Sequence, residues 1–204
     1  MLIVPKIEYA SVVWCPFDKV SLDLIEGFQR RFTSCFLEYQ ECNEERQQYV
    51  CKLDYWERLK DLKIYSLQRR RERFAILYMY RILIGLITFQ WFEPYEERGI
   101  KFRTKYNRRA NPKIRRVRHS SFFYKGPQLW NLLPQELREF EAIDVPCQTH
   151  VDIFKAKLDK FIERVPDQPN VPNLNRFRVA ATNSLICQIP VYRRQQQQIQ
   201  LQNR

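Results

Sequence analysis

The spacing of apolar residues predicts a protein built mainly from α-helices. Apolar side chains recur every three to four residues in four stretches, and this period predicts helices over residues 18–39, 54–63, 66–84 and 149–164. A short aromatic run around residues 119–125 is instead typical of a β-strand. We therefore expect a mainly α fold, a small helical domain of about four helices with a minor β element.

The first predicted helix is amphipathic. Its apolar stripe consists of Leu22, Ile25, Phe28, Phe32 and Phe36. Asp18 is a suitable N-cap residue for this helix. The segment Gln29 to Arg31 lies on the opposite side from the stripe, so we expect these polar residues to face away from the packed side.

Helix-boundary signals support the other three predicted helices. Asp54 followed by Glu57 is typical of a capping box at the start of the second helix. Ser66 is expected to open the third helix and Gly85 to close it. Thr149 is a candidate N-cap for the last helix.

An aromatic corner is expected to organise the core. A strand-like run, Ser121–Tyr124, ends at the Gly126–Pro127 break, and the apolar turn that follows is closed by Pro134. We define the aromatic corner as Phe122, Phe123, Trp130, Asn131 and Pro134. Burial of the apolar side chains in this stretch would remove several hundred Å² of apolar surface from water, on the order of 10 kcal/mol before opposing costs; these are Phe122, Phe123, Trp130, Leu132 and Leu133.

Changes in composition divide the chain into four regions. Residues 1–17 are almost wholly apolar, residues 18–97 contain three of the predicted helices, and residues 98–165 contain a basic stretch, the aromatic corner and the last helix. In residues 166–204, prolines precede a glutamine-rich stretch, which is typical of a linker and a disordered tail.

The charge of the chain favours a polyanionic partner. The formal net charge is +12, and no acidic residue occurs between Arg98 and Lys125. Basic residues interleaved with aromatic rings are typical of proteins that bind RNA or single strands, although such runs are also common as solvated surface. Arginines in the first turn of the 66–84 helix oppose the helix dipole, which makes phosphate contact one explanation for them. The candidate nucleic-acid-binding residues are Arg30, Arg31, Arg70, Arg71, Arg103, Tyr106, Arg108, Arg109, Arg115 and Arg116.

The sequence contains no recognisable catalytic chemistry. The six cysteines form no C-x-x-C pair and there are only two histidines, so we expect no metal site and no cofactor. No phosphate-binding loop, zinc-protease motif or serine-hydrolase motif occurs. Without an apolar stretch of about 20 residues we expect no membrane span, and the reduced cysteines favour an intracellular protein.

Two motifs in the same order resemble one known family. The start of the chain reads LIVPKIEYASVVW, and the aromatic corner reads FF followed by LWNLLP. Both resemble the segment that follows the polymerase core in reverse transcriptases of LINE-type retrotransposons, the non-LTR, jockey-like elements. Shorter phrases agree, including Trp56–Leu59, Ser66–Leu67 and Phe154–Lys155. The resemblance ends near Arg164.

The resemblance implies that residues 1–17 lead in from a missing polymerase core and that residues 18–97 are thumb-like. The chain would be a C-terminal fragment that is not an enzyme by itself, since the paired catalytic aspartates are absent. Its implied partner is template RNA or an RNA/DNA hybrid, in the nucleus or the cytoplasm. The alternative is a retrotransposon-derived protein-interaction or structural module without nucleic-acid binding, with Met1–Trp14 as a candidate contact. A weaker alternative is binding to an anionic membrane surface.

Overall fold

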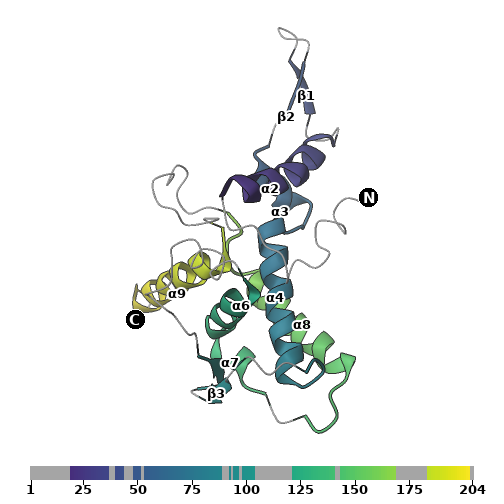
Figure 1. Cartoon of the computed structure of the whole chain (residues 1–204). Helices are drawn as coiled ribbons and strands as arrows, with labels where there is room; N and C mark the ends of the chain where they lie inside the picture. The colour runs from purple at the N-terminus through teal and green to yellow at the C-terminus, as the bar shows by residue number, and fades with distance from the viewer. Residues whose placement is uncertain are drawn as a thin grey trace, which may run out of the picture.

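The computed structural model describes residues 19–36, 40–43, 48–51, 53–88, 92, 94–96, 98–103, 121–140, 143–168 and 183–202. Within these ranges the chain forms seven α-helices and two small antiparallel hairpins, so the predicted mainly α class is confirmed (Figure 1). In chain order the elements are α2 (Lys19–Ser34), β1 (Gln40–Asn43), β2 (Gln48–Cys51), α3 (Tyr55–Asp61), α4 (Leu67–Leu83), β3 (Pro94–Glu96), β4 (Ile100–Phe102), α6 (Phe122–Asn131), α7 (Gln135–Arg138), α8 (Gln148–Ile162) and α9 (Leu185–Gln202).

Helix α4 runs through the centre of the molecule, and the other helices and the β3–β4 hairpin are arranged around it, whereas the β1–β2 hairpin extends away beyond α2 (Figure 1). Helices α6 and α8 pack along α4, and α9 packs on α6. Helices α2 and α3 lie at the N-terminal end of α4, whereas α7 and the β3–β4 hairpin lie at its C-terminal end (Figure 1). Because neighbours surround it, α4 is buried on most of its circumference and not only along one stripe.

The predicted boundary signals of α3 and α4 are confirmed. Asp54 and Glu57 form a capping box, in which the Asp54 amide donates to Glu57 Oε2 at 3.0 Å. Ser66 Oγ accepts a hydrogen bond from the Arg69 amide at 3.1 Å. Gly85 follows the end of α4 with a φ of 81°, a left-handed conformation that glycine adopts at little cost.

The hydrophobic core lies where α4, α6 and α8 meet. The rings of Tyr80 and Phe154 stack with centroids 4.0 Å apart, and Trp130 stacks on Phe154 at 5.6 Å. Leu185 and Ile189 of α9 complete the same cluster and are fully buried. A single hydrophobic cluster therefore contains residues from three of the regions that composition distinguished, 18–97, 98–165 and 166–204.

The predicted strand around residues 119–125 is wrong, because Phe122–Asn131 forms helix α6. Gly126 is the physical reason that the expected break does not occur. A Cβ atom at Gly126 would lie 2.9 Å from Met79 Sδ, so the glycine permits close packing of α6 on α4. Pro127 is accommodated inside the helix. The strands form instead at β1–β2 and at β3–β4.

The predicted orientation of α2 is also wrong. Of the apolar stripe, Leu22 is buried, but Phe28, Phe32 and Phe36 are exposed. The buried side of α2 instead carries the polar residues Glu26, Gln29 and Thr33. These residues make hydrogen bonds to α3, to α4 and to the loop between them, and those bonds determine which side of α2 faces inward.

Two predictions at the C-terminal end need correction. Helix α8 has Cys147 as its N-cap and Thr149 inside its first turn. The prediction of a disordered end is wrong for residues 183–202, which hold α9. Leu185 and Ile189, four residues apart, anchor α9 on the core, and the helix continues through the glutamine-rich stretch because glutamine has good helix propensity.

Candidate nucleic-acid interface

The two candidate arginines of α2 lie on the surface. Arg30 and Arg31 are both exposed. The guanidinium of Arg30 lies 4.9 Å from the centroid of the Tyr55 ring, which is close enough for a cation–π interaction. This contact holds Arg30 near the junction of α2 and α3 and leaves charged surface facing solvent.

The arginine run of α4 has a different role from the one expected. Arg71 is only 4% exposed and donates to Gln68 Oε1 at 3.4 Å, and Arg70 is half-buried. Arg73 makes a two-point ion pair with Asp159 of α8, at 2.5 and 2.7 Å. Phosphate contact therefore does not account for Arg69 and Arg73, which pair with carboxylates of the fold, or for the buried Arg71, whereas phosphate contact by Arg70 stays a prediction.

Carboxylates from distant segments offset the basic start of α4. Glu26 of α2 accepts hydrogen bonds from the backbone amides of Leu67 and Gln68, at 3.1 and 3.3 Å, and from the hydroxyl of Tyr55. Negative charge at a helix N-terminus is favourable because the helix dipole is positive there. Burial nevertheless raises the pKa of Glu26, more than its three hydrogen bonds lower it.

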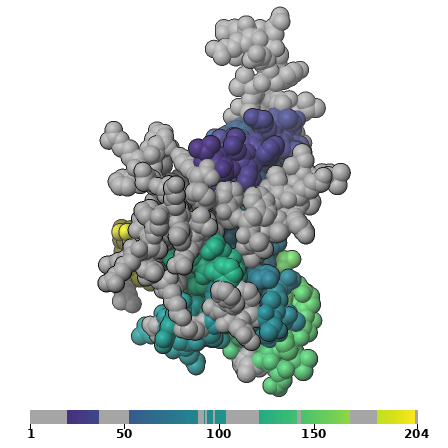
Figure 2. All heavy atoms as spheres, viewed as in Figure 1, coloured from purple at the N-terminus to yellow at the C-terminus, as the bar shows by residue number. Residues whose placement is uncertain are grey.

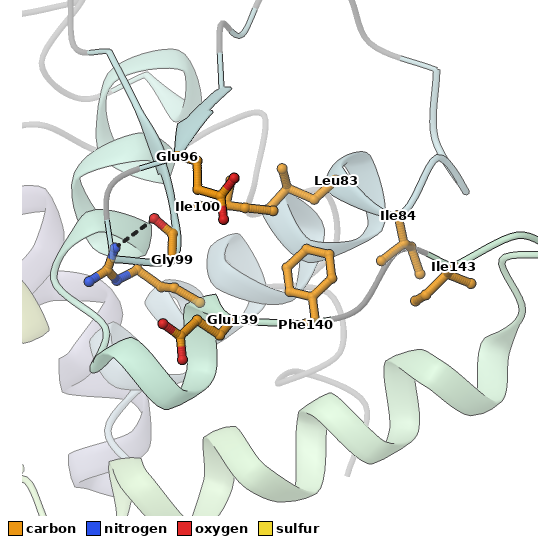
Figure 3. A pocket seen from close by; sticks show the side chains of 9 residues that line it. Leu83, Ile84, Glu96, Gly99, Ile100, Glu139, Phe140 and Ile143 are labelled. Carbon is orange, nitrogen blue, oxygen red and sulfur yellow. Dashed lines mark hydrogen bonds between the residues drawn. The ribbon is translucent and has the colours of Figure 1, made fainter.

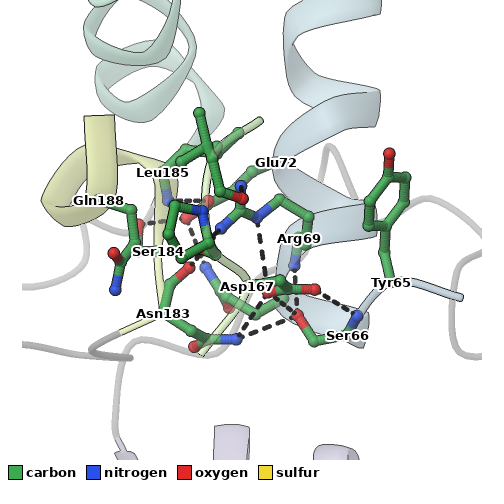
Figure 4. A network of polar contacts seen from close by, with 12 residues as sticks. Tyr65, Ser66, Arg69, Glu72, Asp167, Asn183, Ser184, Leu185 and Gln188 are labelled. Atoms are coloured by element: carbon green, nitrogen blue, oxygen red, sulfur yellow. Dashed lines mark hydrogen bonds and ion pairs between the residues drawn. The ribbon is translucent and has the colours of Figure 1, made fainter. Parts of the chain in front are cut away.

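A buried polar network connects the start of α4 to residues 165–168 and to the start of α9 (Figure 4). Arg69 is fully buried and lies 3.5 Å from Asp167, and its Nη2 atom donates to the Pro166 carbonyl at 2.6 Å. Asp167 accepts from both the amide and the hydroxyl of Ser66, each at 2.8 Å. Asn183 Nδ2 donates to Ser66 Oγ at 3.0 Å.

Glu72 is the other carboxylate of this network. It accepts hydrogen bonds from the Ser184 hydroxyl, from the Leu185 amide at 2.6 Å and from Gln68 Nε2 at 2.6 Å. Burial raises the pKa of Glu72 and of Asp167 and lowers that of Arg69. The network holds α9 on α4 and therefore has a structural role.

Sequence reasoning missed this network because its members are far apart in the chain. Ser66 and Asp167 are separated by 101 residues, and Glu72 and Leu185 by 113 residues. The available signal was the charged sequence from Arg69 to Arg73 in the first turns of a helix predicted to pack in the core, since a buried charge requires partners.

The remaining candidate residues belong to the basic segment that follows β4. Arg103 is exposed, and its guanidinium lies 5.9 Å from the centroid of the Tyr95 ring. Tyr106, Arg108, Arg109, Arg115 and Arg116 lie outside the described residues. The structure does describe the residues that hold the two ends of this segment.

Both ends of the basic segment are fixed to the core. Phe102, on its N-terminal side, is 2% exposed, and Phe122, on its C-terminal side, is 9% exposed. The side-chain amide of Asn131 accepts a hydrogen bond from the Phe102 amide at 2.9 Å and donates one to the Phe102 carbonyl at 2.8 Å. Trp130 Nε1 donates to the Ile100 carbonyl at 2.8 Å. Two neighbouring residues of α6 therefore hold β4 in place.

The other members of the aromatic corner differ in burial. Trp130 is completely buried, whereas Phe123 is 52% exposed. Pro134 is half-buried and is the N-cap residue of α7. The corner is therefore mainly a core element, with one ring at the surface.

The exposed candidates do not form one patch. Arg30 and Arg31 belong to α2, which lies at the N-terminal end of α4, whereas Arg103 directly follows β4, whose hairpin lies at the C-terminal end of α4 (Figure 1). A 17-residue helix is about 25 Å long at 1.5 Å per residue. A nucleic acid that contacted both groups would have to extend along most of the molecule.

A groove of about 700 Å³ lies at the C-terminal end of α4 (Figure 3). Its walls include the apolar side chains of Leu83, Ile100 and Phe140, with the carboxylates of Glu96 and Glu139 nearby. Arg138 is bound to the carbonyls of Leu133 and Gly99, at 3.0 and 3.3 Å. The carboxylates make this groove unsuited to phosphate.

The described parts of the chain contain no group of histidine, cysteine, aspartate or glutamate side chains that could hold a metal ion. None of the helices in these ranges is long and apolar enough to cross a membrane. Comparisons with known protein families, with curated proteins and with solved structures find no match to this chain.

Proposed function

We propose that this chain is the C-terminal segment that follows the polymerase core of a LINE-type reverse transcriptase, and that it binds template RNA or the primer-template without catalysing a reaction. The two motifs at Leu2–Trp14 and Phe122–Pro134 support the family origin. This function would be carried out inside the cell, in the nucleus or the cytoplasm.

The observation that carries the proposal is the attachment of the basic segment. Residues 104–120 carry seven basic residues if His119 is left aside, and no acidic residue. Phe102 and Phe122, which flank this segment, are both buried, and Asn131 fixes the Phe102 backbone with two hydrogen bonds. Binding residues are commonly found on loops that a rigid scaffold positions. The attachment fixes the positions at which the charged segment leaves the core and returns to it.

The chemistry of this segment suits a sequence-tolerant RNA contact. Arginines neutralise phosphates, and a tyrosine ring such as that of Tyr106 can stack on a base. Arg30, Arg31 and Arg103 supply further exposed positive charge. We leave Arg71 out of the proposed interface because it is buried.

Binding of the full chain to a mixed-sequence single-stranded RNA at physiological salt tests this function. We expect a Kd below about 10⁻⁴ M, the weak limit of non-specific nucleic-acid binding. Tyr106→Ala should weaken binding by about 5-fold to 150-fold, which corresponds to the loss of one stacked base. Anionic vesicles are the control, since their binding should not change with Tyr106→Ala. A Kd above about 10⁻⁴ M would favour the alternative that the chain is a protein-interaction or structural module.

A further inference from the structure

A row of large apolar side chains on α2 and directly after its C-terminal end is open to solvent. Val20, Leu24, Phe28, Phe32 and Phe36 follow one another at intervals of four residues. Their exposed fractions range from 70% at Val20 to 38% at Phe36. Figure 2 shows atoms of α2, drawn in purple, at the surface of the upper end of the molecule. We call these five residues the α2 row.

The α2 row faces solvent because the other side of the helix makes polar contacts with the rest of the fold. Glu26 bonds to the start of α4, Gln29 Nε2 donates to the Tyr65 carbonyl at 2.9 Å, and Thr33 Oγ1 accepts from Arg58 Nε at 3.3 Å. These bonds fix the rotation of α2 about its axis. A contiguous apolar row of this size on a soluble surface marks a contact site, and side chains four residues apart form the ridge that packs against a neighbouring segment.

We propose that the chain's own apolar lead-in, residues 2–14, covers the α2 row. This segment lies outside the described residues and ends five residues before the first residue of α2. Its only charged residues are Lys6 and Glu8. Pro16 and the candidate N-cap Asp18 favour a change of chain direction between the two segments.

The lengths of the two segments are compatible with this arrangement. Helix α2 has 16 residues and is about 24 Å long at 1.5 Å per residue. Thirteen residues span about 43 Å when extended and about 20 Å as a helix, so the lead-in can follow most of the row in either form. A reversal of direction places Trp14 near Val20 and Leu2 near Phe36.

Charge favours the lead-in over a second copy of the chain. Each copy carries a formal net charge of +12, and Arg30 and Arg31 are exposed on the same helix as the row. A symmetric pair of α2 helices would bring these arginines close to their equivalents, and like charges would oppose the contact. The lead-in, with one lysine and one glutamate, has no such cost. This inference does not depend on RNA binding.

Photo-crosslinking of the full chain tests the proposal. A benzophenone amino acid replaces Phe28, and a matched variant carries it at Ile153 of α8, which is 52% exposed against 53% for Phe28. Equal amounts of ¹⁵N-labelled and unlabelled chain are mixed, irradiated and analysed as peptides. We expect crosslinks from residue 28 to residues 2–14 within single-label products, and none from residue 153 to that segment. Mixed-label products at residue 28, or no crosslink to residues 2–14, would overturn the proposal.

Hydrogen exchange keeps the test informative if the bulky probe disturbs α2. In the wild-type chain, amides of residues 7–14 should be protected from exchange. Leu24→Asp combined with Phe28→Asp should accelerate their exchange at least about 10-fold, whereas Ile153→Asp should not. A wild-type lead-in that exchanges as fast as an unstructured peptide, or protection unaffected by the α2 substitutions, would refute the covering contact.

Discussion

Trp130 combines complete burial with a hydrogen bond and contacts to four aromatic rings. Its closest ring partner is Phe154, and its Nε1 atom donates to the Ile100 carbonyl. We expect Trp130→Ala to reduce the free energy of unfolding by about 3–5 kcal/mol, because the neighbours can fill only part of the cavity. Urea unfolding measures this change. The half-exposed Phe123 provides the comparison: Phe123→Ala should cost clearly less. A loss below about 1 kcal/mol for Trp130→Ala would mean that the corner is not the core.

Glu72 should make stability depend on pH in a specific direction. Burial raises the pKa of Glu72 above the ordinary value of 4.5. At pH values between 4.5 and this raised pKa, the folded chain keeps a proton on Glu72 that the unfolded chain has released. The free energy of unfolding therefore falls as pH rises through this window. Glu72→Gln cannot titrate and should flatten this part of the pH dependence, whatever its effect at a single pH.

The control for this prediction is Glu136→Gln, which alters an exposed carboxylate on α7. Glu26 and Asp167 also have raised pKa values, so some slope of the same sign should remain in the Glu72→Gln chain. Urea unfolding at several pH values above about 4.5 gives the slopes. If wild type and Glu72→Gln have the same slope, Glu72 does not hold a proton in the folded chain.

At the scale of the element, local signals predicted the existence of helices better than their orientation. The capping box at Asp54 and Glu57 depends on residues three apart, and it is present. The orientation of α2 depends on bonds from Glu26 to Leu67 and Gln68, 41 and 42 residues away, which periodicity does not report. The error at α6 has the same origin, because the role of Gly126 depends on Met79 of another helix.

The ion pair between Arg69 and Asp167 should couple α4 to the segment before α9. Asp167→Ala leaves a fully buried guanidinium with only carbonyl partners, and removing one member of a buried pair costs about 3–5 kcal/mol. Since the side chain of Asp167 is 18% exposed, we expect a loss of about 2–4 kcal/mol. A double-mutant cycle with Arg69→Met should show that the double change costs less than the sum of the single ones. Additive effects would mean that the two residues act independently.

The two ends of α9 should differ in importance. Leu185, Gln188 and Ile189 are buried, whereas residues 195–202 are exposed. Deleting residues 195–204 should change the free energy of unfolding by no more than about 0.5 kcal/mol. Leu185→Ala should cost about 2–5 kcal/mol, because it opens a cavity in the core. Thermal or urea unfolding measures the effect of the deletion and of Leu185→Ala on stability. Equal losses from both changes would contradict the assignment of α9 as a helix anchored at its first turns.

At the scale of the whole molecule, positive and negative charges are used differently. Four carboxylates make hydrogen bonds or ion pairs within the fold: Glu26, Glu72, Asp159 and Asp167. Arg69 pairs with Asp167, and Arg73 pairs with Asp159. Arg30, Arg31 and Arg103 remain exposed. The sequence predicted that basic residues would cluster, but it did not separate those that stabilise the core from those available to a ligand, because that separation depends on long-range packing.

The salt dependence of RNA binding most directly tests the proposed contact between the basic segment and RNA. If Arg103, Arg108, Arg109, Arg115 and Arg116 each contact one phosphate of single-stranded RNA, log K should fall with log salt at a slope of about −0.7 per contact, or about −3.5 in total. Changing all five to glutamine should flatten the slope by a similar amount. The fold should be unaffected, because solvated charges contribute little to stability.

The matched control removes the same charge elsewhere. Lys60, Lys63, Lys155, Lys157 and Lys160 are exposed on α3, on the turn after it and on α8. We predict that the wild-type chain and the chain with these five lysines changed to glutamine have similar steep slopes, whereas the five-arginine variant has a slope flatter by about 3.5. Equal slopes for the two variants, or a wild-type slope near zero, would contradict RNA binding by the basic segment.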